Sequence, residues 1–177
     1  MKILNWGCGE QIHPGWVNSD VRARPGVDLP CNIVEGLPVE DSSFDHAVSI
    51  HGLQDLPWPD IPKALSELHR VLRPGGCLRL AVPDLDRAIE AYRSGDSAYF
   101  YVPDRDARSV GAKLVTQIIW YGTVRTPFTF DYACEVLEDA GFTSVVRCAF
   151  RETKSGYKPL ADLDNRERES LFMEARR

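Results

Sequence analysis

Short apolar runs alternate with segments of helical periodicity along most of this chain, and this alternation narrows its possible folds more than any other feature. The clearest helical segment lies between two such runs, where Ile61, Ala64, Leu65 and Leu68 begin a single apolar stripe that continues to residue 72. Alternating strands and helices are typical of an α/β fold with a parallel sheet. Seven strands are expected, at residues 2–6, 16–20, 27–33, 44–50, 77–82, 144–150 and 170–174.

Further helices are predicted between the later strands. One starts with Asp84 as its cap, and another follows Thr129 and stops at Gly141, a residue type suited to the end of a helix. Residues 93–127 read differently, since only residues 107–119 look helical and the stretch is long for a connection. We expect it to be either a lid on the acceptor side of a binding site or a plain helical cover over the sheet.

Length and composition exclude several classes of protein. A chain of 177 residues suits a single domain, residues 1–177. The net charge of −5 offers no basic surface for nucleic acid, and no apolar segment approaches the length of a membrane span. The five cysteines form no CxxC pair and the four histidines show no ligand spacing, so we predict no metal site. The N-terminus lacks a signal-peptide pattern, and we expect a cytoplasmic protein.

Three successive strand ends carry residues suited to a nucleoside. Gly7, Cys8 and Gly9 follow the first strand, where glycine lets a ligand approach the backbone. Asp20 ends the second strand, where a carboxylate can accept hydrogen bonds from both ribose hydroxyls. Asn32 ends the third, and its carboxamide offers a donor and an acceptor to an adenine edge. Ligands of open α/β sheets bind at this edge, so the three positions predict one site.

The glycine pattern argues against a dinucleotide. The dinucleotide fingerprint needs a third glycine that leads into a helix and an acid about 20 residues further on. Here Ile12 occupies the place of that glycine, Pro14 and Gly15 interrupt any long helix, and Asp20 comes only 13 residues after Gly7. The loop is therefore a poor cradle for phosphates and favours a phosphate-free nucleoside over NAD.

Four stretches in order, LNWGCG, GWVNSD, LPVEDSSFDHAVSIH and RVLRPGGCLRLAVPDL, resemble the class I S-adenosylmethionine-dependent methyltransferases, closest to the type 11 group. The resemblance implies a Rossmann-like, doubly wound and mostly parallel sheet of about seven strands with the last strand antiparallel. It implies S-adenosylmethionine as cofactor and S-adenosylhomocysteine as product. Carried over by position, Gly7, Cys8 and Gly9 meet the methionine part, Asp20 the ribose, and Asn32 with Ile33 the adenine.

The sequence departs from the family pattern at one motif. The group commonly has H-x-L-E-H-L after the fourth strand, and this chain reads His51-Gly52-Leu53-Gln54-Asp55-Leu56. His51 is expected beside the cofactor, and it is the best candidate for a catalytic base if the acceptor is a hydroxyl. The alternative is that His51 only lines the pocket. The loss of the Glu-His pair leaves a second function open, a degenerate module that binds S-adenosylmethionine without turnover and acts through a partner.

The leading hypothesis is a methyltransferase acting on a small-molecule acceptor. The aromatic residues of the stretch 93–127 suit a pocket for such an acceptor, and they suit a homodimer contact equally well. These are Tyr99, Phe100, Tyr101, Trp120 and Tyr121. The mixed charges from Asp162 to Glu169 are expected to form a solvated segment.

Overall fold

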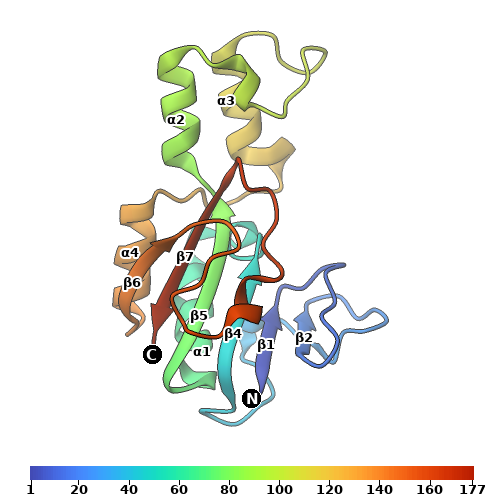
Figure 1. Ribbon diagram of the computed structural model, residues 1–177. Helices are drawn as coiled ribbons and strands as arrows, with labels where there is room; N and C mark the ends of the chain where they lie inside the picture. Colours follow the sequence, from blue (N-terminus) through green and yellow to red (C-terminus); the bar gives the residue numbers. More distant parts are fainter.

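The computed structural model describes all 177 residues and contains one seven-stranded sheet in the order β3-β2-β1-β4-β5-β7-β6 (Figure 1). From β1 to β5 all neighbouring strands are parallel, whereas β7 runs antiparallel to both β5 and β6. The chain thus winds outward from β1 in both directions, which confirms the predicted doubly wound fold. The strands are β1 Ile3–Trp6, β2 Val17–Asp20, β3 Leu29–Pro30, β4 Phe44–Ile50, β5 Leu72–Pro83, β6 Thr143–Cys148 and β7 Ser170–Arg176.

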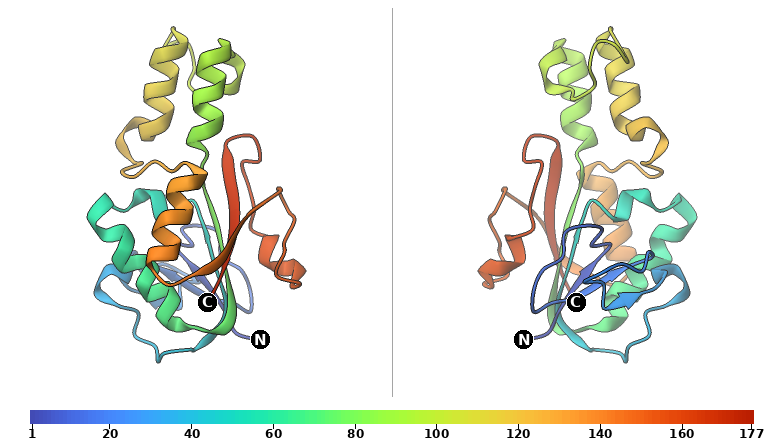
Figure 2. Two further views of the ribbon diagram at one scale, coloured as in Figure 1. Left: turned by 90° about the vertical axis from the view of Figure 1, so that its left-hand side faces the viewer. Right: turned by 90° about the vertical axis from the view of Figure 1, so that its right-hand side faces the viewer.

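Four α-helices accompany the sheet: α1 Ile61–Val71, α2 Leu85–Ser94, α3 Val110–Ile119 and α4 Phe130–Asp139. Helices α1 and α4 cover one face of the sheet. Helices α2 and α3 form a pair that projects beyond the end of β5 (Figures 1 and 2). The predicted cap Asp84 is confirmed, because its side chain accepts from the N–H of Arg87. Thr129 caps α4 in the same way and accepts from the N–H of Tyr132. None of the helices combines the length and apolar character that a bilayer crossing demands.

The face under α1 and α4 holds the larger hydrophobic core. Alternate strand residues such as Leu4, Ala47 and Leu80 point to this face and pack against Leu65 and Leu68 of α1, all of them essentially inaccessible to solvent. This is the apolar stripe that the sequence pattern indicated. Burial of such a stripe against a sheet supplies most of the stability of a helix of this length.

The opposite face is covered by the β6–β7 connection, residues 149–169, which passes in front of β5, β4 and β1 (Figure 1). Its only regular element is a short 3-10 helix, Lys158–Ala161, on the side away from α1 and α4 (Figure 2). Leu160 of this segment joins a second core with Ile3, Val48 and Phe172. A segment from late in the sequence therefore closes a sheet face against water.

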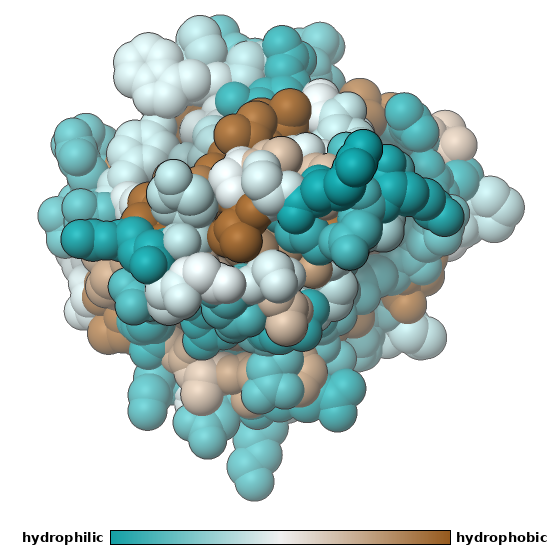
Figure 3. All heavy atoms as spheres, turned by 90° about the horizontal axis from the view of Figure 1, so that it is seen from above, coloured by the Kyte–Doolittle hydropathy of each residue, from teal (hydrophilic) through white to brown (hydrophobic).

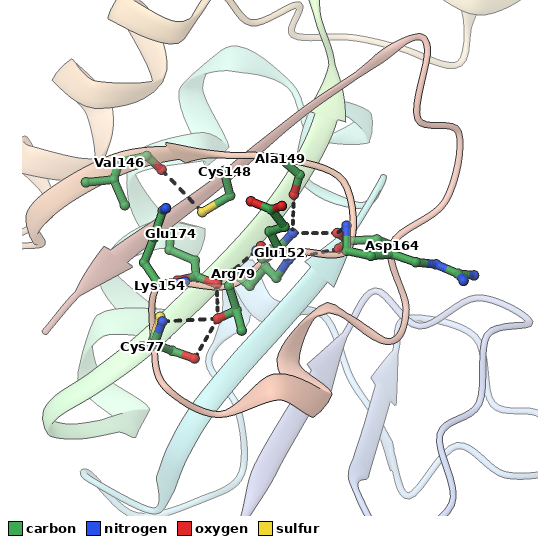
Figure 4. Close-up of polar contacts among 12 residues, drawn as sticks. Cys77, Arg79, Val146, Cys148, Ala149, Glu152, Lys154, Asp164 and Glu174 are labelled. Atoms are coloured by element: carbon green, nitrogen blue, oxygen red, sulfur yellow. Dashed lines mark hydrogen bonds and ion pairs between the residues drawn. The ribbon is translucent and has the colours of Figure 1, made fainter.

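A buried ion network fixes this connection to the sheet (Figure 4). Arg79, in the middle of β5, has a fully buried side chain that binds both carboxylate oxygens of Asp164, at 2.8 and 2.5 Å. It also donates at 2.9 Å to Glu174 of β7 and at 2.9 Å to the carbonyl oxygen of Glu152. The expectation of a solvated segment over residues 162–169 is wrong at Asp164 and at Glu169, which are both buried.

Two strands differ from the predicted ranges by more than two residues at one end. β3 has only two residues, and a 3-10 helix, Ile33–Glu35, replaces the rest of the predicted strand. β5 begins already at Leu72, directly after α1, so the sequence Pro74-Gly75-Gly76 lies within the strand. The N–H of Gly75 donates to the carbonyl oxygen of Arg177, a partner at the other end of the chain.

Candidate active site

The backbone after β1 makes a tight turn that brings two glycines close together. Gly7 has a φ of +66°, in the left-handed region that favours glycine. A Cβ atom on Gly7 would lie 3.4 Å from the Cα of Gly52, which follows β4, and a Cβ on Gly52 would lie 2.9 Å from the hydroxyl oxygen of Ser49. The two turns that follow β1 and β4 therefore pack closely against each other and against Ser49.

The acid and the amide predicted from the sequence lie beside this turn. One carboxylate oxygen of Asp20 accepts from the N–H of Gly9 at 2.9 Å, and the other accepts from the N–H of Arg22 at 2.9 Å. These bonds hold the carboxylate in place and leave each oxygen a further lone pair for a ligand hydroxyl. Asn32 accepts from the N–H of Val34 at 3.2 Å and so caps the 3-10 helix.

All seven residues predicted for the site line one cleft of about 570 Å³, which we call the glycine-loop cleft. They are Gly7, Cys8, Gly9, Asp20, Asn32, Ile33 and His51. Its volume lies within the range of small-molecule sites. Figure 3 shows the molecule from above this end of the sheet, where apolar residues reach the surface among polar ones. The structure thus brings the predicted residues together, and their roles in binding stay predictions.

The β6–β7 connection supplies wall residues that sequence reasoning missed. Asn165 and Arg166 line the glycine-loop cleft, although they lie more than 100 residues after the glycine turn in the sequence. Asp55 lines it as well. No local pattern distinguishes Asn165 and Arg166 from a surface loop, because their position depends on how residues 149–164 cover the sheet. The pairing of Arg79 with Asp164 and the packing of Leu160 fix that path.

His51 is held in a defined orientation at the end of β4. Its φ of +57° is unusual for a residue other than glycine, and such strained positions are concentrated at functional sites. The Oγ of Ser170 donates to the carbonyl oxygen of Arg166 at 2.9 Å, so it accepts from Nε2–H of His51 at 2.8 Å. The neutral ring then carries its lone pair on Nδ1, which is buried and has no hydrogen-bond partner.

Burial in the cleft favours the neutral forms of His51 and Cys8. Burial, aided by the charge of Arg166, lowers the pKa of His51 to about 3. The imidazole is therefore neutral at physiological pH, with a free lone pair but weak basicity. Burial and the nearby carboxylate of Asp20 raise the pKa of the Cys8 thiol, which argues against Cys8 as a nucleophile.

A second cavity of about 280 Å³ adjoins the glycine-loop cleft, and we call it the acceptor-side pocket. The two cavities share His51, Asp55 and Arg166. The new walls of the acceptor-side pocket include Gln54 and Glu169. Gln54 donates to the carbonyl oxygen of His51 at 2.6 Å, and its own side-chain oxygen is buried without a partner. This arrangement places a small polar space directly beside the larger cleft.

The stretch 93–127 reaches the acceptor-side pocket through the end of α3. Of its five aromatic residues, only Trp120 lines that pocket. Tyr99 and Phe100 are buried against α2, and Tyr101 and Tyr121 are exposed. A lid role for this stretch stays a prediction. The buried pair Tyr99 and Phe100 is unavailable for contact with a second subunit.

The glycine-loop cleft fits S-adenosylmethionine better than a dinucleotide. The turn after β1 leads into a loop, since the next regular element is β2, and therefore no helix N-terminus faces the cleft there to receive a pyrophosphate. The cleft that Gly7 and Gly52 line and the spare lone pairs of Asp20 suit an amino-acid chain and a ribose.

Comparison with known proteins agrees with this description. Residues 6–80 match a family described as "Methyltransferase domain". Over 125 residues, or 67% of this chain, the sequence is 32% identical to the ubiquinone/menaquinone biosynthesis C-methyltransferase UbiE of Methylobacterium nodulans. The match spans 46% of that relative, so the chain covers about half the length of the protein it resembles.

Solved structures share the fold at low sequence identity. A SAM-dependent methyltransferase from Archaeoglobus fulgidus aligns with a TM-score of 0.62 at 12% identity, covering 99% of this chain and 86% of the other. The 1,6-didemethyltoxoflavin-N1-methyltransferase of Burkholderia thailandensis, solved with S-adenosylhomocysteine, aligns with a TM-score of 0.55 at 18% identity, covering 99% and 70%. These likenesses show that the chain has the fold of S-adenosylmethionine-dependent methyltransferases, and the match over residues 6–80 shows that this part of the chain is similar to a methyltransferase domain.

Proposed function

We propose that this chain transfers a methyl group from S-adenosylmethionine to a small-molecule acceptor. The observation that carries the proposal is the single cleft that gathers the glycine turn, Asp20 and Asn32 at neighbouring strand ends, next to a second, smaller pocket. Relatives named for quinone biosynthesis make quinone-type ring compounds one acceptor class to test.

In this proposal the chain's own residues position the cofactor and exclude water. The backbone of residues 7–9 contacts the methionine part, Asp20 accepts from the ribose hydroxyls, and Asn32 with Ile33 meets the adenine. When bound, the cofactor supplies an electrophilic methyl group on a sulfonium. Alignment of two bound reactants accounts for much of the rate in such a displacement, and the chain contributes that alignment.

His51 borders both cavities, so it would lie near the transferred methyl group. Its free Nδ1 lone pair supports a role as an acceptor of a proton or hydrogen bond from the substrate. A variant His51→Asn tests this, because asparagine tolerates the left-handed backbone and lacks the ring nitrogen. Loss of turnover with unchanged cofactor affinity supports the role of His51 as a base. Unchanged turnover leaves the ring as a wall of the pocket.

Calorimetry with S-adenosylmethionine, S-adenosylhomocysteine and NAD tests the cofactor. We expect both S-adenosyl compounds to bind and NAD not to bind. NAD binding without S-adenosyl binding would refute the proposal. Transfer of a labelled methyl group to acceptor classes then tests the activity. Tight S-adenosyl binding with no transfer to any class would favour the binding module instead.

We further propose that residues 93–127 close over the acceptor. Hydrogen exchange with and without S-adenosylhomocysteine tests this, because a lid gains protection when the ligand binds. Increased protection across residues 95–122 supports the lid. Full protection beforehand that falls only when the protein is diluted would assign this stretch to a homodimer contact.

A further inference from the structure

Two residues that line the acceptor-side pocket carry buried hydrogen-bond acceptors without a partner. The side-chain oxygen of Gln54 is buried without a partner, and Gln54 as a whole is only 4% exposed. Its orientation is fixed because its amide nitrogen donates to the carbonyl oxygen of His51. Nδ1 of His51 is a second buried acceptor without a partner. Buried acceptors left unpaired cost free energy, so a ligand that donates to them gains affinity.

Glu169 adds a negative charge to the same wall. It is 8% exposed, and its surroundings give its carboxylate only the charges of Arg166 and Arg168, with no hydrogen bond. Its one ionic contact is a loose one, 3.7 Å from Arg166. Buried carboxylates are ordinarily paired or hydrogen-bonded more closely than this. Burial raises the pKa of Glu169, which makes it a better proton acceptor than an ordinary carboxylate.

Arg166 is the only cationic residue that lines the acceptor-side pocket, and it borders two cavities. It lines the glycine-loop cleft as well as the acceptor-side pocket, and its side chain is 51% exposed. A half-exposed guanidinium offers little attraction to an anion within the pocket, because solvent screens it. Asp55 adds a further carboxylate to the rim that the two cavities share. The pocket is therefore rich in acceptors and in negative charge.

We propose that the acceptor-side pocket binds a small amine as the methyl acceptor, with Glu169 and Gln54 accepting hydrogen bonds from its nitrogen. This inference rests on the proposed methyl transfer and names its substrate class. Methylation forms one C–N bond and breaks the C–S bond, whose electron pair stays on the sulfur of S-adenosylhomocysteine. The bound ammonium first gives one proton to the carboxylate of Glu169, which passes it to water, and the lone pair freed on the nitrogen then forms the C–N bond. The ring of Trp120 supplies an apolar wall for the rest of the amine.

Three probes of similar size test the charge preference. These are 2-phenylethylamine, 2-phenylethanol and 3-phenylpropionate, titrated by calorimetry into the protein loaded with S-adenosylhomocysteine. We expect the amine to bind at least tenfold more tightly than the other two, the usual effect of a charged hydrogen-bond partner. Glu169→Gln keeps the shape of the side chain and removes the charge, so it should reduce the difference between amine and alcohol to about threefold or less.

The matched control is Glu167→Gln, an exposed position two residues earlier that does not line this pocket. It should leave the tenfold preference intact. Equal or tighter binding of the alcohol or the carboxylate would overturn the inference, as would a preference that survives Glu169→Gln. So would no binding of any probe to the loaded protein. Failure of S-adenosylhomocysteine itself to bind would instead refute the proposed function, so the two failures are distinguishable.

Discussion

Substitution of Asp164 by asparagine should destabilise the protein more than any change at the surface. Asp164 and Arg79 both have fully buried side chains, and the change removes the charge that balances the guanidinium. Breaking one partner of a buried pair typically costs about 3–5 kcal/mol. With a urea dependence of about 2 kcal/mol per molar for a domain of this size, the unfolding midpoint should fall by roughly 1.5–2.5 M.

Urea unfolding followed by circular dichroism measures this shift. Asp162→Asn is the control, since Asp162 is exposed two residues earlier and its change should stay within about 0.5 kcal/mol. A triple variant, Arg79→Met with Asp164→Leu and Glu174→Gln, removes the charges together and should be more stable than Asp164→Asn alone. A loss below about 1 kcal/mol for Asp164→Asn would refute the reasoning, because the network would then carry no uncompensated charge.

Three further outcomes are expected. Between pH 7 and pH 5 wild-type protein should lose about 2 kcal/mol of stability that His51→Asn keeps, because the unfolded imidazole binds a proton below its ordinary pKa of about 6.5 while the folded one, with a pKa of about 3, does not. Urea midpoints at both pH values measure this, and equal losses would contradict it. Asp20→Ala should weaken S-adenosylhomocysteine binding by about 1.5–3 kcal/mol in calorimetry while the fold persists. An unchanged dissociation constant would remove Asp20 as the ribose ligand. Gly52→Ala should cost about 1–3 kcal/mol of stability, because its Cβ would meet the Ser49 hydroxyl at 2.9 Å, and should also weaken cofactor binding. Wild-type values in both assays would show that the turn adjusts freely.

The parts of the fold that local patterns determine could be predicted from the sequence. The stripe of α1, the cap Asp84 and the start of α4 after Thr129 depend on residues a few positions apart. The clustering of Gly7, Asp20, Asn32 and His51 follows from a general property of parallel sheets, whose carboxyl ends meet at one edge.

Features that depend on distant partners could not be predicted. Arg79 looks like an outward-facing residue of an alternating strand, and its partners lie 85 and 95 positions later in the chain. Glu169 stands in a run of mixed charges that is typical of a solvated loop. Its burial depends on the path of the β6–β7 connection and on the pocket beside it. The periodicity of a segment carries no information about such contacts, because they join residues that are far apart in the sequence.

The position of β7 has a consequence for how the protein is made. The ribosome synthesises this strand last, yet β7 lies inside the sheet, between β5 and β6. A nascent chain that has reached residue 150 has its glycine turn, while Arg79 still lacks both carboxylates and the face of Ile3 and Val48 still lacks its cover. Contacts of such long sequence separation form late, and exposed apolar faces attract chaperones in the meantime. Cofactor capture therefore waits for residues 165–169, which supply the last wall of the site.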